Sequence, residues 1–480
     1  MPDARSIWSF MPRTASWPSR SPSLPQLRSS SDPRWSCKYS LKFCSIAANT
    51  TGVGFHPRRL LALLRARLAA RPITVLTGAR QTGKTTIVRD LLPAGGDLPS
   101  VYFSLDDPDE RLRLAADPVR RLDHGARIVV LDEIQKQPAL LDAVKLLADR
   151  GEGRRFLLLG SAQVLLLRQV RETLAGRAAL LELWPLGLVE RVEGPEAPLS
   201  GLDQIWREGE AAVRRMAESP PSADDARLWR GRAEEHFLWG GYPALEPMPP
   251  EERRAWLRDF RRTYLERDLA DLGRVADLDQ FALAQNLLAA RTGQLLSHSE
   301  VARELGVAVN TVKRYVRFLE ISYQLFLLRP LQPTVTARLV KSPKLYWTDP
   351  ALASLLGERA GAADGALFET AVLDELLRWS SWQPEPPALH FFRTHAGREV
   401  DFILHAPDRV VALEAKSSER AHRTDARPLT EVLGALTLRG VARDAWRVGL
   451  VVTRGREVEP LAPGVWAVPD WRLFGPAGLT

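Results

Sequence analysis

The segment GARQTGKT, residues 78–85, has the residue types and spacing of a loop that binds phosphate. It follows the apolar segment ITVL, which is typical of a buried strand, and it opens TTIVRDLL, which we expect to be a helix. Gly78 and Gly83 would let backbone N–H groups face a phosphate, and Lys84 would neutralise its outer oxygens. The Thr85 hydroxyl would contact Mg²⁺. The segment therefore predicts a site for ATP and Mg²⁺.

A second motif, RIVVLDEIQ, ends a buried strand with two acids. Asp132 would hold the Mg²⁺ through water, and Glu133 would orient or activate the attacking water, which favours hydrolysis over simple nucleotide binding. The alternative is that the acids only end a strand and cap the next helix. The residues expected to bind the nucleotide and its metal are Gly78, Ala79, Arg80, Gln81, Thr82, Gly83, Lys84, Thr85, Thr86, Asp132 and Ser161. The residues expected to be catalytic are Glu133, Lys84 and Arg177.

Three of these residues have two interpretations each. Ser161, in RFLLLGSAQ, could contact the γ-phosphate or the water, or it could cap a helix. Arg177, in LAGR, could reach the γ-phosphate of its own chain or of a neighbouring copy, or it could be a solvated surface residue. Arg80, within the loop, could also reach the γ-phosphate, or it could pair with an acid.

A third group of polar residues lies in EVDFILHAPDRVVALEAK, residues 399–416, which alternates like a β-hairpin. If residues 406–409 form the loop, Asp401 lies directly across from Glu414, and Glu399 lies across from Lys416. The apolar residues then fill the opposite face, so this register is self-consistent.

Two carboxylates about 5 Å apart at Cβ repel each other unless a cation lies between them. Mg²⁺ accepts one or two carboxylates plus waters, so Asp401 and Glu414 are predicted metal ligands. Lys416 could steady an attacking water or a phosphate, and Glu369, on an expected helix, could add a carboxylate. The alternative is a structural cluster that keeps the acids as salt bridges, for example Glu399 with Lys416.

The expected elements place these groups in an α/β protein. Residues 73–190 alternate strands and helices, which indicates a parallel sheet covered on both faces. Residues 194–226 contain loops around the helix IWREGEAAVRRMAE, and residues 227–290 are mostly helical. Residues 295–347 predict a helix-turn-helix with a strand pair, and residues 367–470 return to α/β.

The helix-turn-helix is SHSEVARELGVAVNTVKRYVRFLE, with its turn at Gly306 and a cap at Ser297 or Ser299. Its second helix should turn Val312, Tyr315, Val316 and Leu319 inward. The outward residues should be Asn310, Lys313, Arg314 and Arg317, and Arg338, Lys341 and Lys344 resemble a basic wing nearby. DNA contact through this face and a protein–protein joint both remain open.

Composition sets limits on the class of protein. The chain has 480 residues and a net charge of +8, which permits nucleic-acid binding without arguing for it. No stretch reaches the roughly 18 apolar residues that span a bilayer, so we expect a cytoplasmic protein with no membrane contact. Both cysteines, Cys37 and Cys44, precede the expected fold, which fits a reducing compartment. Residues 1–52 are rich in Ser, Pro and Arg. We expect them to be a disordered, functionally silent tail, or to be present only because the translation start is assigned too far upstream.

Several motifs in order resemble one family: LTGARQTGKT, VVLDEIQ, LAGRAALLELWPLGLVE, GGYPAL, TYLERDL, PKLYWTD, REVDFIL and LEAKSS. The chain is similar to bacterial and archaeal AAA-type ATPases that carry a C-terminal domain of unknown function. The resemblance implies an ATPase domain, a winged helix and a C-terminal fold like that of restriction endonucleases. It also places Lys84, Thr85, Asp132 and Glu133 at the nucleotide site.

The expected organisation is a tail (1–52), a P-loop ATPase domain (53–190), a helical linker or lid (191–276), a winged helix (277–350) and a nuclease-like α/β domain (360–470). We expect an ATPase that couples its nucleotide state to the winged helix and the nuclease-like module, acts on or near DNA, and could form a homo-oligomer. The alternatives are an Mg²⁺-dependent DNA nuclease regulated by ATP and a non-enzymatic switch that binds ATP.

Overall fold

The computed structural model describes residues 56–92, 100–123, 126–151, 153–160, 174–194, 196–272, 278–331, 341–358, 364–435 and 440–479. These residues belong to one of the two units into which the chain divides, Gly54–Thr480. The predictions for residues 1–52, Ser161 and Arg338 lie outside the described residues.

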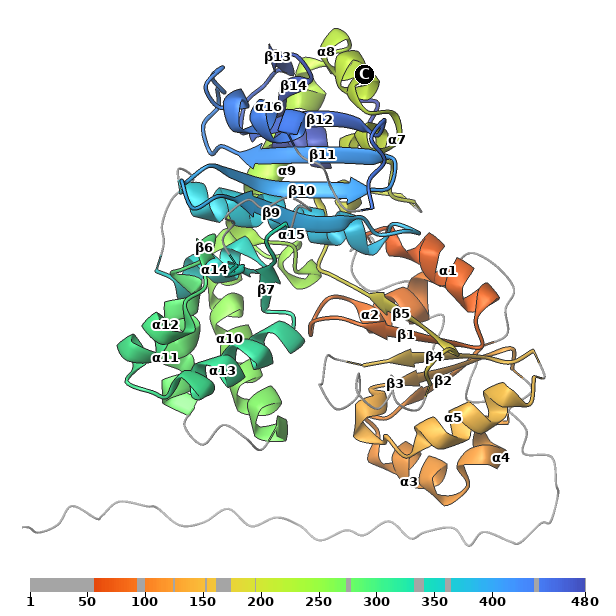
Figure 1. Ribbon diagram of the computed structural model, residues 1–480. Coiled ribbons are helices and arrows are strands. Elements are labelled where there is room, and N and C mark those ends of the chain that lie inside the picture. The colour runs from red at the N-terminus through yellow and green to blue at the C-terminus, as the bar shows by residue number, and fades with distance from the viewer. Residues whose placement is uncertain are drawn as a thin grey trace, which may run out of the picture. The chain divides into compact units, whose positions relative to one another are not determined.

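Five parallel strands form the first sheet, in the order β2-β3-β4-β1-β5. They are β1 (Ile73–Thr77), β2 (Ser100–Ser104), β3 (Ile128–Asp132), β4 (Arg155–Leu159) and β5 (Ala178–Glu182). Helix α1 (Leu60–Ala70) packs on one face, and α3 (Pro108–Ala116), α4 (Pro118–Leu122) and α5 (Leu140–Asp149) pack on the other (Figure 1). Every residue of β1 and β3 is buried, which confirms the predicted parallel sheet with two covered faces.

A helical region follows this sheet. It contains η4 (Leu188–Glu190), α7 (Gly201–Glu208), α8 (Glu210–Glu218), α9 (Ala223–Trp239), η5 (Pro243–Leu245) and α10 (Pro250–Leu272). The prediction of a single helix for IWREGEAAVRRMAE is wrong. The helix is interrupted at Gly209, which has φ 64°, so α7 and α8 are separate helices. A Cβ on Gly209 would lie 3.1 Å from the Trp446 ring, so this residue joins α7 and α8 at a close contact.

The next elements are α11 (Leu278–Ala289), β6 (Gln294–Leu295), α12 (His298–Leu305), α13 (Val309–Ile321), β7 (Leu325–Leu328) and β8 (Lys344–Trp347). The strands form an antiparallel sheet in the order β6-β8-β7. Ser297 caps α12 through the amide of Glu300, and Gly306, with φ 67°, ends it. The four residues predicted to point inward on α13 are buried, and two helices and a strand pair lie where they were predicted.

The C-terminal part has a six-stranded mixed sheet in the order β13-β14-β12-β11-β10-β9. Its strands are β9 (Ala388–Arg393), β10 (Glu399–Ala406), β11 (Arg409–Ala415), β12 (Trp446–Thr453), β13 (Glu459–Ala462) and β14 (Val465–Pro469). Its helices are α14 (Pro350–Leu356), α15 (Gly365–Ser381), α16 (Ala426–Ala435) and α17 (Asp470–Phe474). Separate clusters of apolar side chains fill its two faces, one with α15 and one with α16.

The hairpin of β10 and β11 has the predicted register. His405 pairs with Val410, and Ile403 pairs with Ala412. The turn is tighter than predicted, because Ala406 also pairs with Arg409. The alternation of apolar and polar residues decided this register, since a slip of one residue would exchange the two faces of the strand.

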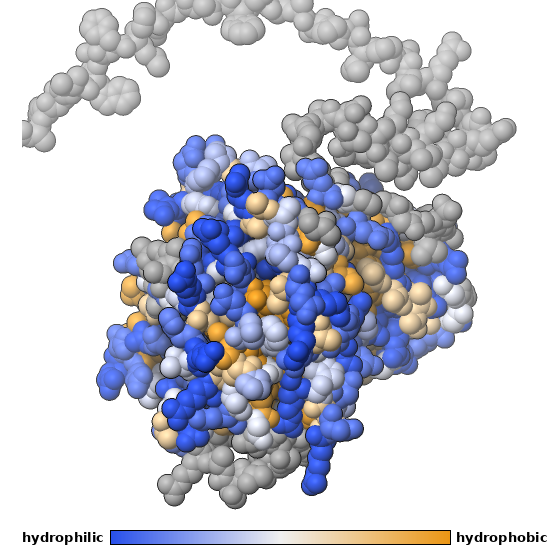
Figure 2. Space-filling view, turned by 90° about the horizontal axis from the view of Figure 1, so that it is seen from above, coloured by the Kyte–Doolittle hydropathy of each residue, from blue (hydrophilic) through white to orange (hydrophobic). Residues whose placement is uncertain are grey.

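Hydrophilic side chains cover most of the face drawn in Figure 2, and smaller apolar areas lie between them. Within the described ranges, every helix is too short or too polar to cross a membrane.

Candidate functional site

The loop between β1 and the next helix has the backbone of a phosphate cradle. Gly78, Gln81 and Gly83 have φ values of 149°, 64° and 88°. The chain then continues as α2 (Lys84–Thr86) and a π-helical turn, η1 (Ile87–Leu91), where a helix was predicted. A Cβ on Gly78 would lie 2.1 Å from the Leu183 carbonyl oxygen. Gly78 is therefore required by close backbone packing as well as by its φ.

The side chain of Lys84 folds over this loop. Its Nζ donates to the carbonyl oxygens of Gly78 at 3.0 Å and Ala79 at 2.7 Å. The Thr82 hydroxyl also donates to Ala79, at 3.0 Å. Lys84 is 7% exposed, so its ammonium lies where the loop encloses it. An anion bound in the loop would offer this ammonium stronger acceptors than the two carbonyls.

Two oxygen ligands suited to Mg²⁺ meet beside the loop. Thr85 Oγ1 donates to Asp132 Oδ2 at 2.9 Å, and Asp132 is buried at the end of β3. Hydroxyl and carboxylate oxygens are ligands that Mg²⁺ prefers. The predicted pair therefore fits the metal, with Thr85 and Asp132 as the residues that would hold it.

Tyr102 on β2 also contacts this carboxylate and was missed in the sequence. Its hydroxyl donates to Asp132 Oδ2. Burial and the Asp132 carboxylate together raise the pKa of Tyr102, so the phenol keeps its proton and acts as a donor. The register Ser104↔Asp132 places β2 beside β3, but the sequence alone does not show which strands are neighbours.

Glu133 follows Asp132 at the same sheet edge. It has φ 56°, in the left-handed region that non-glycine residues avoid, and its amide donates to Asp132 Oδ1 at 2.9 Å. Gln135 Nε2 donates to Glu133 Oε2. Strained backbone of this kind occurs at active sites, where the fold holds a side chain in one direction.

Arg58 is a second residue that the sequence did not reveal. It donates to the Thr82 carbonyl at 2.8 Å and the Trp184 carbonyl at 2.6 Å, and it forms an ion pair with Glu190 at 3.3 Å. It is 9% exposed. Arg58 therefore ties the phosphate loop to the segment that leaves β5.

The structure does not bring Arg177 to the phosphate loop of its own chain. Ala178, the next residue, pairs with Ile73 at the start of β1, whereas the loop begins after Thr77 at the other end. The length of β1 separates them by about 13 Å. Arg177 instead forms an ion pair with Asp149 at 2.6 Å.

The predicted outer face of α13 is exposed at Asn310, Lys313, Arg314 and Arg317. Burial and the nearby Lys313 lower the pKa of His298 on α12. The prediction of Lys344 as part of a basic wing is wrong. Lys344 begins β8, but it is 2% exposed and points into the C-terminal sheet.

Lys344 lies in the predicted acidic cluster of the C-terminal part. Its Nζ is 2.6 Å from Glu369 Oε1 and 3.2 Å from Asp401 Oδ1, and it also forms an ion pair with Glu399. Lys416 pairs with Glu414 at 2.8 Å. The proposed Glu399–Lys416 pair does not form, because Glu399 pairs with Lys344 and, at 2.9 Å, with Arg393.

The ladder of β10 with β11 ends at the Phe402↔Leu413 pair, and β10 is irregular between Val400 and Ile403, so the predicted pairing of Asp401 with Glu414 is not part of this ladder. Asp401 Oδ2 accepts the amide of Ala415 at 3.0 Å. Burial, and then the Asp401 carboxylate, raise the pKa of both Glu414 and Glu369 above the ordinary range. Burial alone would lower the pKa of Lys344, but Asp401, Glu369 and Glu399 raise it. In the part of the chain that the structure describes, no three His, Cys, Asp or Glu residues are arranged to hold a metal ion.

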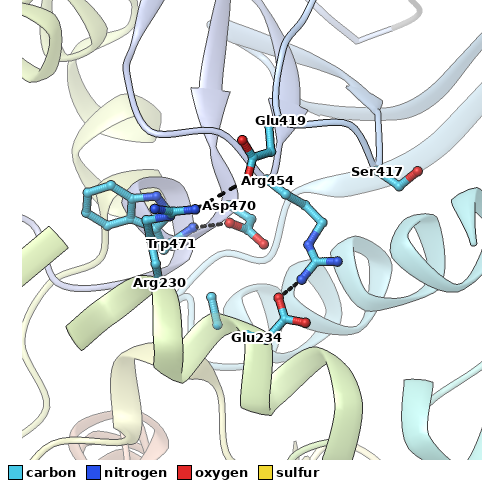
Figure 3. A pocket seen from close by; sticks show the side chains of 8 residues that line it. Arg230, Glu234, Ser417, Glu419, Arg454, Asp470 and Trp471 are labelled. Carbon is cyan, nitrogen blue, oxygen red and sulfur yellow. Dashed lines mark hydrogen bonds and ion pairs between the residues drawn. The ribbon is translucent and has the colours of Figure 1, made fainter. Parts of the chain in front are cut away.

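A cavity of about 220 Å³ lies at the carboxyl ends of β11, β12 and β14, against α9 (Figure 3). Its guanidinium groups are already paired, Arg230 with Glu419 at 3.5 Å and Arg454 with Glu234. Burial raises the pKa of Asp470 to about 6, although its backbone contact and Arg454 act against this shift. The charges of this cavity largely neutralise one another, so the cavity does not favour a particular ligand.

Comparison with known families agrees with the geometry of the first site. An AAA domain matches residues 70–192. A domain of unknown function (DUF8612) matches residues 230–362, and another (DUF4143) matches residues 364–473. The parallel sheet, the phosphate loop and the AAA match together define an ATP-binding, AAA-type P-loop ATPase domain.

Two relatives establish the family. They are uncharacterized proteins of Mycobacterium bovis and Mycobacterium tuberculosis, each 32% identical over 424 residues, which cover 86% of this chain and 83% of each relative. This chain belongs to the same family as these proteins. A solved structure of the Aeropyrum pernix ORC1 protein in complex with DNA is similar at 16% identity and a TM-score of 0.25, over 64% of this chain and 94% of that chain.

Proposed function

We propose that this protein is an ATP-hydrolysing switch whose nucleotide state is passed to its helical and C-terminal parts. The observation that carries this proposal is the contact of Thr85 with Asp132 beside the loop of residues 78–86. Bound Mg²⁺ would supply positive charge to the phosphate oxygens. The backbone amides of the loop would hold the phosphates, and Lys84 would exchange its carbonyl partners for phosphate oxygens.

Glu133 is the proposed base for hydrolysis. Its carboxylate would accept the proton of the attacking water, while Gln135 holds one of its oxygens and the strained backbone sets its direction. The hydrogen bond from the Tyr102 hydroxyl helps to keep the Asp132 carboxylate oriented toward Thr85. These contacts support hydrolysis over binding alone.

Two routes of side-chain contact support the transfer of nucleotide state. Tyr323, which follows α13, lies with its hydroxyl 2.8 Å from Thr77 Oγ1 and donates to Glu182 at 3.1 Å. Thr77 directly precedes the phosphate loop, so a change there reaches the end of α13. Arg58 similarly joins the loop to Glu190.

Lys84→Ala tests the nucleotide site. The variant should bind ATP about ten- to a hundredfold more weakly, because a charged hydrogen-bond donor to phosphate is lost. Titration with ATP in the presence of Mg²⁺ measures this change. Lys145→Ala, which removes the same charge from α5, should bind ATP like the parent chain. Equal affinity in Lys84→Ala would refute a phosphate site in this loop.

Arg177 is proposed to act on a nucleotide bound by a neighbouring copy. The register of β5 with β1 places it at the far end of the sheet from its own loop. Its partner Asp149 holds it at the surface, where a second molecule could reach it. This role requires a homo-oligomer.

Residues 278–347 are proposed to be a winged helix that binds DNA. The helices α11, α12 and α13 accompany an antiparallel sheet in the order β6-β8-β7. Helix α13 exposes Lys313, Arg314 and Arg317 on one face. A helix with this exposed basic face suits phosphate and major-groove contacts. Lys341 is exposed nearby, whereas the buried Lys344 cannot contribute.

DNA binding should weaken when salt is added, and Lys313→Ala/Arg317→Ala should lower the slope of log K against log salt by about two units. Each lost phosphate contact removes about one unit from this slope. Fluorescence anisotropy of a labelled duplex at several salt concentrations measures it. Arg120→Ala/Arg121→Ala on α4 removes the same charge and should leave the slope unchanged. Failure of the parent chain to bind DNA at low salt would favour a protein-contact role.

A second candidate function is a metal-dependent nuclease in the C-terminal part, regulated by ATP. The observation that favours it is the closeness of Asp401 and Glu414 at the neighbouring ends of β10 and β11, where the Asp401 carboxylate helps to raise the pKa of Glu414 and Lys416 pairs with Glu414 at 2.8 Å. The αβββαβ order from α15 through β12 also resembles the nuclease-like fold. Cleavage of DNA with added Mg²⁺ or Mn²⁺ that is lost in Asp401→Asn would support it.

A further inference from the structure

The ammonium of Lys344 is fully surrounded by acids from another part of the chain. Lys344 belongs to β8, in the β6-β8-β7 sheet, whereas its partners are Glu369 on α15 and Glu399 and Asp401 on β10. An ammonium has three donors, and three carboxylates face it here. Its exposed fraction is 2%, so water does not screen these ion pairs.

This ammonium occupies an oxygen of Asp401 that a divalent cation bound to Asp401 would also need. Asp401 uses Oδ1 toward Lys344 and accepts the Ala415 amide at 3.0 Å with Oδ2. Across the hairpin, Glu414 gives Oε1 to Lys416, and its Oε2 is buried with no hydrogen-bond partner among the described residues. A metal that linked Asp401 to Glu414 would compete with Lys344 for the Asp401 carboxylate.

We propose that Lys344 is an internal cation that occupies the carboxylate cluster and excludes divalent metal from it. Removal of the ammonium leaves Glu369 and Asp401 without their shared positive charge. These hard oxygen ligands, together with Glu414, then take Mg²⁺ or Mn²⁺. The inference uses the metal position from the proposed nuclease function, but it does not depend on ATP hydrolysis or on DNA cleavage.

The position of β8 makes this contact a connection between modules. β8 pairs with β7, which begins two residues after Tyr323, and the Tyr323 hydroxyl contacts Thr77 beside the phosphate loop. A shift of this three-stranded sheet relative to α15 therefore withdraws Lys344 from the acids. The same movement opens the cluster to metal.

Metal titration of Lys344→Met tests the proposal in the full-length protein. This variant should melt at a lower temperature than the parent chain in EDTA, because buried acids lose their cation. Millimolar Mn²⁺ should restore its melting temperature, with an affinity at least about tenfold tighter than in the parent chain. Asp401→Asn added to this variant should abolish the metal response. Lys341→Met, an exposed control on the same segment, should behave like the parent chain.

A second variant keeps the test decisive if Lys344→Met does not fold. Lys344→Met/Glu399→Gln removes one positive and one negative charge together, so the net charge of the cluster is unchanged and the fold should persist. Calorimetry should detect Mn²⁺ binding to this variant. No Mn²⁺ binding to a folded Lys344 variant overturns the proposal. Binding to the parent chain with equal affinity, lost in Asp401→Asn, also overturns it.

Discussion

Glu133→Gln should bind ATP as tightly as the parent chain and hydrolyse it about 10²- to 10⁴-fold more slowly. Glutamine keeps the size and the hydrogen-bonding reach of glutamate but cannot accept a proton from water. Lys84, Thr85 and Asp132, which hold the nucleotide and metal, are untouched. Phosphate release in the steady state, measured beside ATP affinity, separates the two effects.

The matched control is Glu252→Gln on α10, which makes the same chemical change at an exposed residue outside the ATPase sheet. It should leave both turnover and affinity unchanged. If Glu133→Gln turned over ATP at the parent rate, another group would have to activate the water. If it lost affinity as well, Glu133 would act in binding, through the Asp132 segment to which its amide is bonded.

Arg378→Met should destabilise the protein by about 3–5 kcal/mol, the largest stability effect that we expect from one substitution. Arg378 is fully buried and pairs with Asp374 at 2.6 Å and Glu375 at 3.3 Å. It also lies 2.8 Å from His236 Nε2. Methionine fills a similar volume but leaves two buried carboxylates without their cation. Chemical denaturation, monitored by circular dichroism, measures the loss.

The defect of Arg378→Met should grow as pH rises. Burial already raises the pKa of Asp374 well above its ordinary value, even with Arg378 beside it. Without Arg378 the folded state holds this proton still more strongly than the unfolded chain does. Stability from such a group is present at low pH and is lost as pH rises toward the folded-state pKa. The variant should therefore be closest to the parent chain under acidic conditions.

Arg427→Met provides the control for the buried pair. Arg427 forms an ion pair with Glu431, also four residues away on a helix, but its side chain is 82% exposed. Solvent screens this pair, so its loss should cost less than about 0.5 kcal/mol at any pH. An equally small effect in Arg378→Met would show that the Asp374 and Glu375 carboxylates are protonated and need no cation.

Glu375, the second partner of Arg378, connects α15 to the segment that follows the ATPase sheet. Its Oε1 accepts the Leu188 amide at 2.9 Å and lies 2.8 Å from His236 Nε2. Arg378 thus helps to hold α15 against the segment that follows the ATPase sheet. Partial loss of ATPase activity in folded Arg378→Met would indicate that this junction also supports the nucleotide site.

Local patterns in the sequence were sufficient for the phosphate loop and for the hairpin. The spacing of Gly78, Gly83 and Lys84 lies within one turn between a strand and a helix, so chain connectivity alone brings these residues together. The register of residues 402–406 with residues 409–413 follows from the alternation of apolar residues along two adjacent strands. Both features depend on neighbours in sequence, which is why they could be predicted.

Tertiary structure alone decided which distant residues complete these sites. Arg58 and Tyr102 reach the nucleotide site from other elements, and their own sequence segments carry no motif. Arg177 has a suitable type and position in the sequence, but the parallel order of β5 and β1 places it at the opposite edge. Lys344 belongs by local pattern to a basic wing, yet the packing of β8 against α15 and β10 buries it among acids. A buried ammonium is stable only beside opposite charges, and those charges come from residues that are adjacent only after the chain has folded.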